Sequence, residues 1–125
     1  MTDINSREDI VLLVNSFYEK VRGDELIGPV FEERIKDDWE PHLQKMYGFW
    51  ENILFGNNAY SGRPFPPHAT LGIDVPHFER WIALFHETLN ELFEGKRAEE
   101  AKKRAVLIGR VFLEKLEMMG RVGRE

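Results

Sequence analysis

Apolar side chains recur at helical spacing along most of the chain, and this periodicity constrains the fold more than any other feature. Four long segments carry apolar residues three or four positions apart, and a shorter helix is expected to open near Pro29. The long segments cover residues 7–22, 37–55, 76–93 and 97–119. No segment alternates apolar and polar residues as a half-buried strand does. The sequence therefore predicts an all-α protein with four main helices.

The residues at the first helix ends support this division. The tetrapeptide SRED fits a capping box, in which Ser6 caps the first helix and Asp9 follows three residues later. Gly23 is expected to stop the same helix. The termini, about residues 1–6 and 119–125, are expected to fray.

Composition narrows the class of protein further. The 125 residues suffice for one core, and no repeat or linker divides them, so a single domain over 1–125 is expected. The chain has no cysteine, which excludes disulfides, thiolate metal sites and a cysteine nucleophile. Any metal must therefore be held by histidine or carboxylate. Because neither a signal peptide nor a membrane span is indicated, a cytoplasmic protein is expected.

The charge of the chain argues against nucleic acid and membrane partners. The net charge is -5 at pH 7, which disfavours a phosphate-binding surface. The basic cluster KRAEEAKKR is interleaved with acids and forms no single positive stripe. It fits a solvated helix face with acid–base pairs about four residues apart.

Most enzyme classes lack their minimal motif in this sequence. It contains no Walker loop, no GxGxxG fingerprint and no GxSxG nucleophile elbow. The segment HETLN begins like a zinc-protease motif, but Asn90 stands where the second histidine is required. No pair of histidines has the spacing of a structural zinc site. We therefore assign no catalytic residue.

Four histidines are the candidates for nitrogen ligation or acid–base chemistry at neutral pH. His68 lies in GRPFPPHATLG, where three prolines and two glycines prevent a long helix. This stretch belongs to a connection over residues 56–75, and connections of that length are often functional. His42 is expected on a buried helix face, because apolar residues follow it at steps of four, three and four. His77 and His86 receive no site role.

These features together are the parts of a haem pocket. Haem needs a slot lined by apolar side chains, one axial imidazole and a distal side of tuned polarity. Nine Phe and three Trp supply bulky apolar surface, although they serve an ordinary core equally well. A proline-stiffened segment can hold the His68 ring in one orientation at little entropic cost. A surface-loop histidine is the simpler alternative, and spacing alone leaves both open.

The sequence resembles the group III truncated haemoglobins from Ile10 to about Leu116. Five blocks in the same order carry the resemblance. They are FYEKVR at 17–22, LIGPVF at 26–31, DDWEPHLQKMYGFW at 37–50, YSGRPFPPH at 60–68 and HFERWIALFHET at 77–88. The double-glycine motifs of the other truncated groups are missing, as is usual for group III. The resemblance implies a truncated globin-like helical sandwich around a pocket for haem b, iron protoporphyrin IX.

The resemblance also implies a role for five residues. His68 matches the proximal iron ligand, and Phe31 matches the phenylalanine that stacks against the porphyrin. His42 occupies the position of the distal-helix histidine, and Tyr18 and Trp81 match the distal tyrosine and tryptophan. All five are thus expected to bind the cofactor, with Tyr18, Trp81 and His42 also facing the gas ligand.

Structural roles for the distal residues stay open as alternatives. Tyr18 can be a core tyrosine whose hydroxyl donates to a carbonyl, and Trp81 can be an anchor of the core. His42 can be a hydrogen-bonded core histidine or a gate that does not touch the ligand. The indole N–H of Trp81 is a donor only, which suits a ligand that accumulates negative charge.

The resemblance implies reversible binding of O2, NO or CO at a haem iron. Two donors worth roughly 1.5–3 kcal/mol each would slow O2 release by orders of magnitude, which disfavours simple oxygen transport. The alternative is a haem-dependent redox enzyme, such as an NO dioxygenase or a peroxidase-like enzyme. It would need a separate reductase, because the chain has no flavin or nicotinamide domain. A haem-free helical interaction module is a third class.

Overall fold

Five α-helices make up the described part of the chain. The computed structural model describes residues 1–56 and 75–118, the side chains at 112 and 115–118 excepted. The helices are α1 (Arg7–Gly23), α2 (Gly28–Ile35), α3 (Trp39–Phe55), α4 (Val75–Leu92) and α5 (Lys96–Met118). The described ranges contain no strand, and the prediction of an all-α protein is confirmed.

The helix boundaries lie within two residues of those expected from the periodicity. The predicted cap of α1 is present, since the backbone N–H of Asp9 donates to Oγ of Ser6 at 3.3 Å. Gly23 is the last residue of α1, as expected. The local signals of capping and periodicity therefore suffice to place the helices along the chain.

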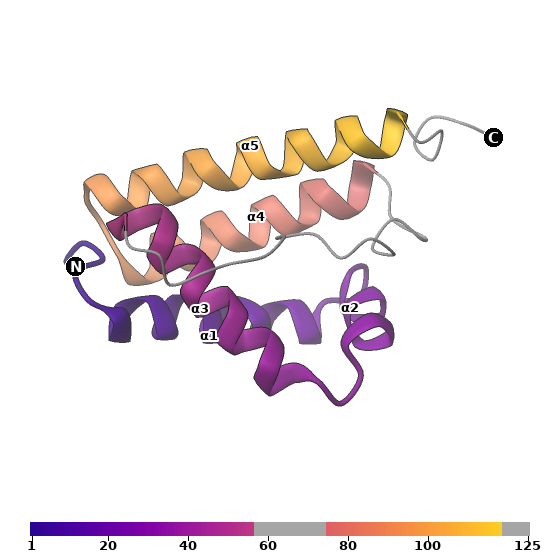
Figure 1. Ribbon diagram of the computed structural model, residues 1–125, viewed down its shortest axis with the longest axis horizontal. Coiled ribbons are helices and arrows are strands. Elements are labelled where there is room, and N and C mark those ends of the chain that lie inside the picture. The colour runs from indigo at the N-terminus through magenta and orange to yellow at the C-terminus, as the bar shows by residue number, and fades with distance from the viewer. Residues whose placement is uncertain (57–74, 119–125) are drawn as a thin grey trace.

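The N-terminal helix α1 contacts three of the other four helices. It packs against α2, α3 and α4, and α4 in turn packs against α5. Figure 1 shows α4 and α5 side by side along the long axis of the molecule, while α3 crosses α1 at a steep angle. Residues on α1 can therefore contact residues of three other helices, so a site that combines side chains from several helices can form around α1.

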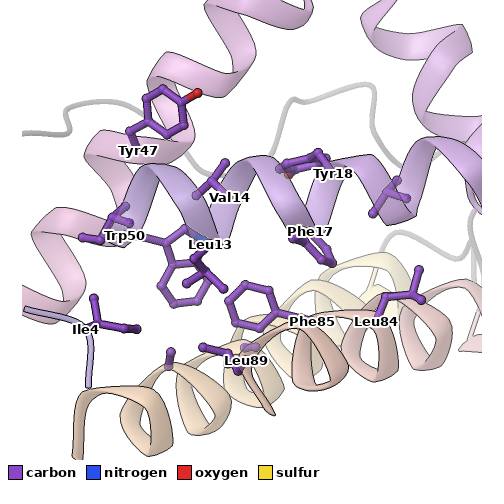
Figure 2. Close-up of a cluster of buried hydrophobic side chains, with 14 of the residues drawn as sticks. Ile4, Leu13, Val14, Phe17, Tyr18, Tyr47, Trp50, Leu84, Phe85 and Leu89 are labelled. Atoms are coloured by element: carbon purple, nitrogen blue, oxygen red, sulfur yellow. The ribbon is translucent and has the colours of Figure 1, made fainter. Parts of the chain in front are cut away.

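Aromatic and aliphatic side chains from α1, α3 and α4 form the core (Figure 2). The Phe17 ring contacts the Phe85 ring edge to face at 5.1 Å, and Trp50 stacks on Phe85 at 4.9 Å. Ile4 and Leu89 are completely buried. The generous aromatic content of the sequence is thus used in part to fill an ordinary core.

The buried face of α3 is displaced from the expected one. The sequence places His42 on it, with Met46, Phe49 and Ile53, but all four residues are only half-buried. The buried residues of α3 are Trp39, Tyr47, Gly48 and Trp50. Because α3 crosses α1 at an angle, one edge of its apolar surface meets the core fully and the other edge only in part.

The first six residues, for which the sequence predicts fraying, pack onto the start of α5. Ile4 has no exposed surface. The backbone N–H groups of Arg97 and Ala98 donate to the Asp3 carboxylate, both at 2.9 Å. Asp3 thereby satisfies two of the unpaired N–H groups of the first turn of α5. A cap supplied from the other end of the sequence holds the N-terminal segment in place.

Gly95, just before α5, makes this cap possible and supports a first prediction. Its φ is 149°, and a Cβ there would lie 2.5 Å from Cγ of Asp3. Gly95→Ala is therefore expected to lower the free energy of unfolding by about 1–3 kcal/mol, measured by urea denaturation. Gly23→Ala is the matched control, because a Cβ at Gly23 meets no atom within 4 Å. Equal stability of the two variants would contradict a structural role for the Asp3 cap.

None of the helices, over the residues that the structure describes, is both long and apolar enough to span a membrane.

Candidate functional site

Four of the five predicted site residues lie in the described ranges, each on a different helix. Tyr18 is on α1, Phe31 on α2, His42 on α3 and Trp81 on α4. The fifth, His68, lies outside the described residues. Residues that are distant in sequence thus come from four helices toward one end of α1.

The Tyr18 ring is the centre of this group. Its centroid lies 5.1 Å from that of His42 and 6.0 Å from that of Phe31, both in edge-to-face geometry. Tyr18 also contacts Phe17 at 4.9 Å, and Phe17 contacts Trp81 at 5.8 Å. Phe31 and His42 therefore each contact the Tyr18 ring directly, whereas Trp81 is connected to Tyr18 through Phe17.

The Tyr18 hydroxyl keeps its proton and donates to none of the described residues. The side chain is buried, and burial raises the pKa of the phenol above its ordinary value. The phenol is therefore neutral at physiological pH. An O–H that donates to none of these residues is available to a bound molecule.

His42 presents a second unused polar atom. Its Nε2 is buried and has no hydrogen-bond partner within residues 1–56 and 75–118. Burial, with a smaller contribution from the positive charge of Lys45, lowers the pKa of His42 to about 4. The ring is therefore neutral at pH 7, with one nitrogen protonated and the other able to accept a hydrogen bond.

Trp81 is half-buried on the inner side of α4. Its ring stacks on Phe85, with centroids 5.9 Å apart and planes 3° from parallel. The indole N–H donates to no residue in the described ranges, so it is a third donor free for a ligand. The side chain contacts the core through its ring while its N–H keeps its hydrogen-bonding capacity.

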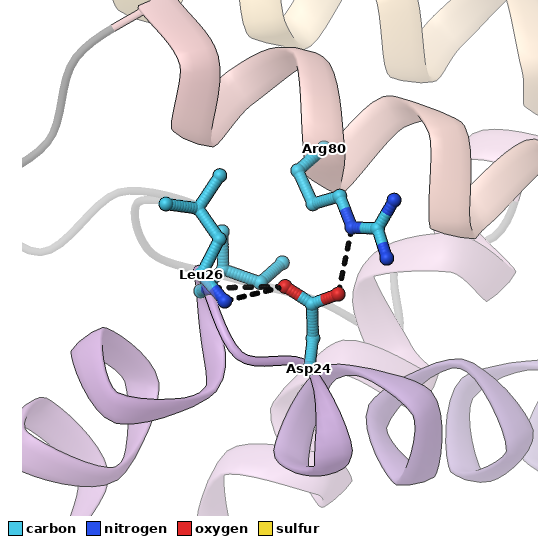
Figure 3. A network of polar contacts seen from close by, with 4 residues as sticks. Asp24, Leu26 and Arg80 are labelled. Carbon is cyan, nitrogen blue, oxygen red and sulfur yellow. Dashed lines mark hydrogen bonds and ion pairs between the residues drawn. The ribbon is translucent and has the colours of Figure 1, made fainter.

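A polar corner between α1 and α2 fixes the relative positions of three of these helices (Figure 3). The Asp24 carboxylate accepts the backbone N–H groups of Leu26 and Ile27, each at 3.0 Å, and Nε of Arg80 at 2.6 Å. Although burial raises the pKa of Asp24, these hydrogen bonds lower it below its ordinary value. Since Arg80 is on α4, the ionised Asp24 ties the α1–α2 corner to that helix.

Gly28 allows α2 to begin directly against the end of α1. A Cβ at this position would lie 2.9 Å from the carbonyl oxygen of Val21, closer than side chains approach backbone atoms. The close approach places Phe31, one turn further along α2, against Tyr18. This glycine lies in the LIGPVF block, in which helical spacing alone predicts no role for it.

Trp39 is a site residue that the sequence analysis does not single out. Its ring lies 5.8 Å from that of Tyr18 and 6.0 Å from that of His42. Its indole N–H donates to Oε1 of Glu32 at 3.2 Å. One signal was present, because residues three apart on a helix share a face and Trp39 precedes His42 by three.

The arrangement suits a flat apolar cofactor that carries a small polar ligand. Aromatic side chains supply the apolar contact, and they lie around His42 Nε2, a buried atom without a hydrogen-bond partner among the described residues. Buried polar atoms in folded proteins are nearly always paired, so this one indicates a missing partner. The residues present therefore fit haem with a gas ligand.

Comparisons with known proteins agree with this chemistry. The family model described as "Bacterial-like globin" matches residues 2–111. A group 3 truncated haemoglobin from Campylobacter jejuni is 33% identical over an alignment of 123 positions, and the match covers 92% of this chain and 94% of that protein. A crystal structure of a group III truncated haemoglobin from Campylobacter jejuni superimposes with a TM-score of 0.76 at 32% identity, covering 93% of this chain and 95% of the other.

The family match spans most of the chain, and both similar proteins cover it almost completely. The match also includes the helices that carry Tyr18, Phe31, His42 and Trp81. The chain therefore belongs to the bacterial-like globins, among the group III truncated haemoglobins, and is a haem-binding globin.

Proposed function

We propose that this globin reversibly binds O2, NO or CO on haem b, with His68 as the protein ligand of the iron. Phe31 contacts the porphyrin, and Tyr18, Trp81 and His42 line the side where the gas binds. The observation that carries the proposal is the buried Nε2 of His42, which has no hydrogen-bond partner among the described residues and whose ring lies 5.1 Å from the Tyr18 ring.

The energetics of burial support a ligand at this place. A buried polar group without a partner costs about 1–3 kcal/mol of stability. The buried Nε2 of His42 is such a group, and an apolar side chain in its place would avoid that cost. A ligand that accepts or donates a hydrogen bond there offsets the cost when it binds.

The protonation states of these groups determine which ligand they favour. Haem, when bound, supplies an iron to which a diatomic gas can attach. Tyr18 remains a protonated donor because burial raises its pKa, and His42 remains neutral at pH 7 because its pKa is about 4. Neutral donors favour a gas that draws negative charge from the iron. They therefore favour O2 over CO.

The rate of O2 release separates carriage of the gas from chemistry on it. Several donors acting together slow release, and a globin that holds O2 for long is suited to a redox reaction of the bound gas. Such a reaction requires electrons from a separate reductase. Slow O2 release combined with rapid reaction with NO or peroxide supports the redox role, whereas fast release supports reversible binding alone.

The optical spectrum of the haem-supplied protein tests the proposal directly. We expect one sharp Soret band for the ferric protein that shifts on reduction with dithionite and again on addition of CO. Stopped-flow mixing of the O2-saturated protein with CO then gives the O2 release rate. A protein that takes up no haem would contradict the proposal.

A further inference from the structure

The carboxylate of Glu32 joins three helices at the edge of the site. Its Oε2 accepts Nε of Arg22 at 2.8 Å, and its Oε1 accepts the indole N–H of Trp39 at 3.2 Å. Arg22 lies in the last turn of α1, Glu32 lies in α2 and Trp39 begins α3. We call this set of three residues the Glu32 bridge.

The Glu32 bridge fixes the Trp39 ring from its outer side. The guanidinium carbon of Arg22 lies 4.4 Å from the centroid of that ring, within the range of a cation–π contact. Trp39 itself is 8% exposed, whereas the Arg22 and Glu32 side chains are 49% and 43% exposed. A solvent-facing ion pair therefore covers a buried indole.

The inner side of the Trp39 ring contacts the proposed gas-binding residues. It meets Tyr18 at 5.8 Å and His42 at 6.0 Å, with interplanar angles of 65° and 87°. Edge-to-face contacts of this kind constrain the orientation of both partners. A rotation of Trp39 would consequently open space beside the Tyr18 and His42 rings.

Charge keeps the bridge closed at neutral pH. The Arg22 guanidinium, and then the hydrogen bond from Trp39, lower the pKa of Glu32 below its ordinary value. The carboxylate is ionised at neutral pH and accepts two charge-assisted hydrogen bonds, which are stronger than neutral ones. The Trp39 N–H is consumed by this contact and is not a donor for a ligand.

We propose that Glu32 is a positioning residue for gas binding, which acts by holding the Trp39 indole against Tyr18 and His42. This inference rests on the proposed function, because it concerns the rate at which a gas leaves the site that those two residues line. Loss of the carboxylate frees the indole, loosens the packing beside Tyr18 and His42, and speeds release.

The test compares Glu32→Met with the matched variant Glu100→Met in the haem-loaded protein. Glu100 is also 43% exposed and accepts Nε of an arginine, Arg104, at 2.7 Å, but its pair lies within α5. Both substitutions remove one ion pair of equal exposure. Glu32→Gln is the conservative variant, since its amide oxygen can still accept the Trp39 N–H.

Two readouts follow the indole and the gas separately. The indole N–H resonance of Trp39 in the CO-saturated protein is assigned by its disappearance in Trp39→Phe. We expect Glu32→Met to shift this resonance and to speed O2 release about three- to tenfold, the effect of one hydrogen bond. Glu100→Met should change neither, and Glu32→Gln should restore part of both. In a Trp39→Phe background, Glu32→Met should add nothing further.

Three results would overturn the inference: an unmoved Trp39 resonance in Glu32→Met, an O2 release rate equal to that of Glu100→Met, or an undiminished effect of Glu32→Met in the Trp39→Phe background. A different result would contradict the proposed function itself. If Tyr18→Phe leaves the O2 release rate unchanged, the gas does not bind beside Tyr18, and the inference about Glu32 is then wrong as well.

Discussion

Replacement of His68 by alanine is expected to abolish the sharp Soret band of the haem-supplied protein, or to make it dependent on added imidazole. The physical reason is that the proposal gives the iron only one ligand from the protein. Without it the haem is held by apolar contacts alone, and free imidazole can enter the space left by the side chain. The measurement is the absorption spectrum of the ferric, reduced and CO-bound forms, with and without imidazole.

His86→Ala is the matched control for this loss. His86 is a half-buried histidine on α4, and its Nε2 lies 3.4 Å from the carbonyl oxygen of Lys102 in α5. Its removal costs a helix–helix contact but no proposed iron ligand, so the spectrum should be unchanged. A His68→Ala protein with a normal Soret band and no need for imidazole would show that another side chain holds the iron.

Local rules account for most of the fold. Apolar periodicity, the Ser6 cap and the glycine and proline positions place both ends of the four long helices, and the start of α2, within two residues of those observed. These signals are local, because a helix forms its hydrogen bonds within a few residues and buries one stripe of its surface. The angle at which α3 crosses α1 is set by packing and not by local sequence. For this reason the face of α3 that carries His42 was predicted to be buried, whereas the fully buried face carries Tyr47 and Trp50.

Contacts between distant residues were beyond the reach of such rules. Asp3 caps α5 by a hydrogen bond to Ala98, 95 residues away in sequence, and no local sequence pattern near either residue predicts this contact. The Glu32 contact with Trp39 is equally hidden, since a glutamate on a short helix has many possible partners. A sequence pattern predicts which residues face inward, but only the packed structure shows which polar atoms form hydrogen bonds with each other.

The resemblance to group III truncated haemoglobins assigns Tyr18, Phe31 and His42 to one site, which periodicity does not do, and the structure brings their rings together. Helical spacing alone gives no reason for Tyr18 and His42 to meet, yet their rings are in contact. The resemblance does not predict the burial, the hydrogen bonding or the pKa values of Tyr18 and His42. The orphaned Nε2 of His42 and the lowered pKa of that ring depend on burial, which is a property of the folded chain.

Replacement of Tyr18 by phenylalanine is expected to accelerate O2 release by a large factor while haem binding persists. Loss of one hydrogen bond to a partly charged partner, at about 1.5–3 kcal/mol, corresponds to roughly 10- to 150-fold in rate. The ring stays in place, so its contacts with His42 and Phe31 are retained. CO release should change much less, because CO draws little negative charge from the iron. Stopped-flow release of both gases measures the difference.

Tyr47→Phe separates this effect from the general cost of removing a buried hydroxyl. Tyr47 is buried on α3, and its hydroxyl donates to Oδ1 of Asn15 at 2.6 Å, so it already has a partner within the protein. Its removal should lower the free energy of unfolding and leave O2 release unchanged. Tyr18→Phe should speed O2 release and leave the free energy of unfolding almost unchanged, because a hydroxyl that donates to no protein group adds little to stability. If both variants lose stability and neither alters O2 release, the Tyr18 hydroxyl serves the fold and the gas is held by other groups.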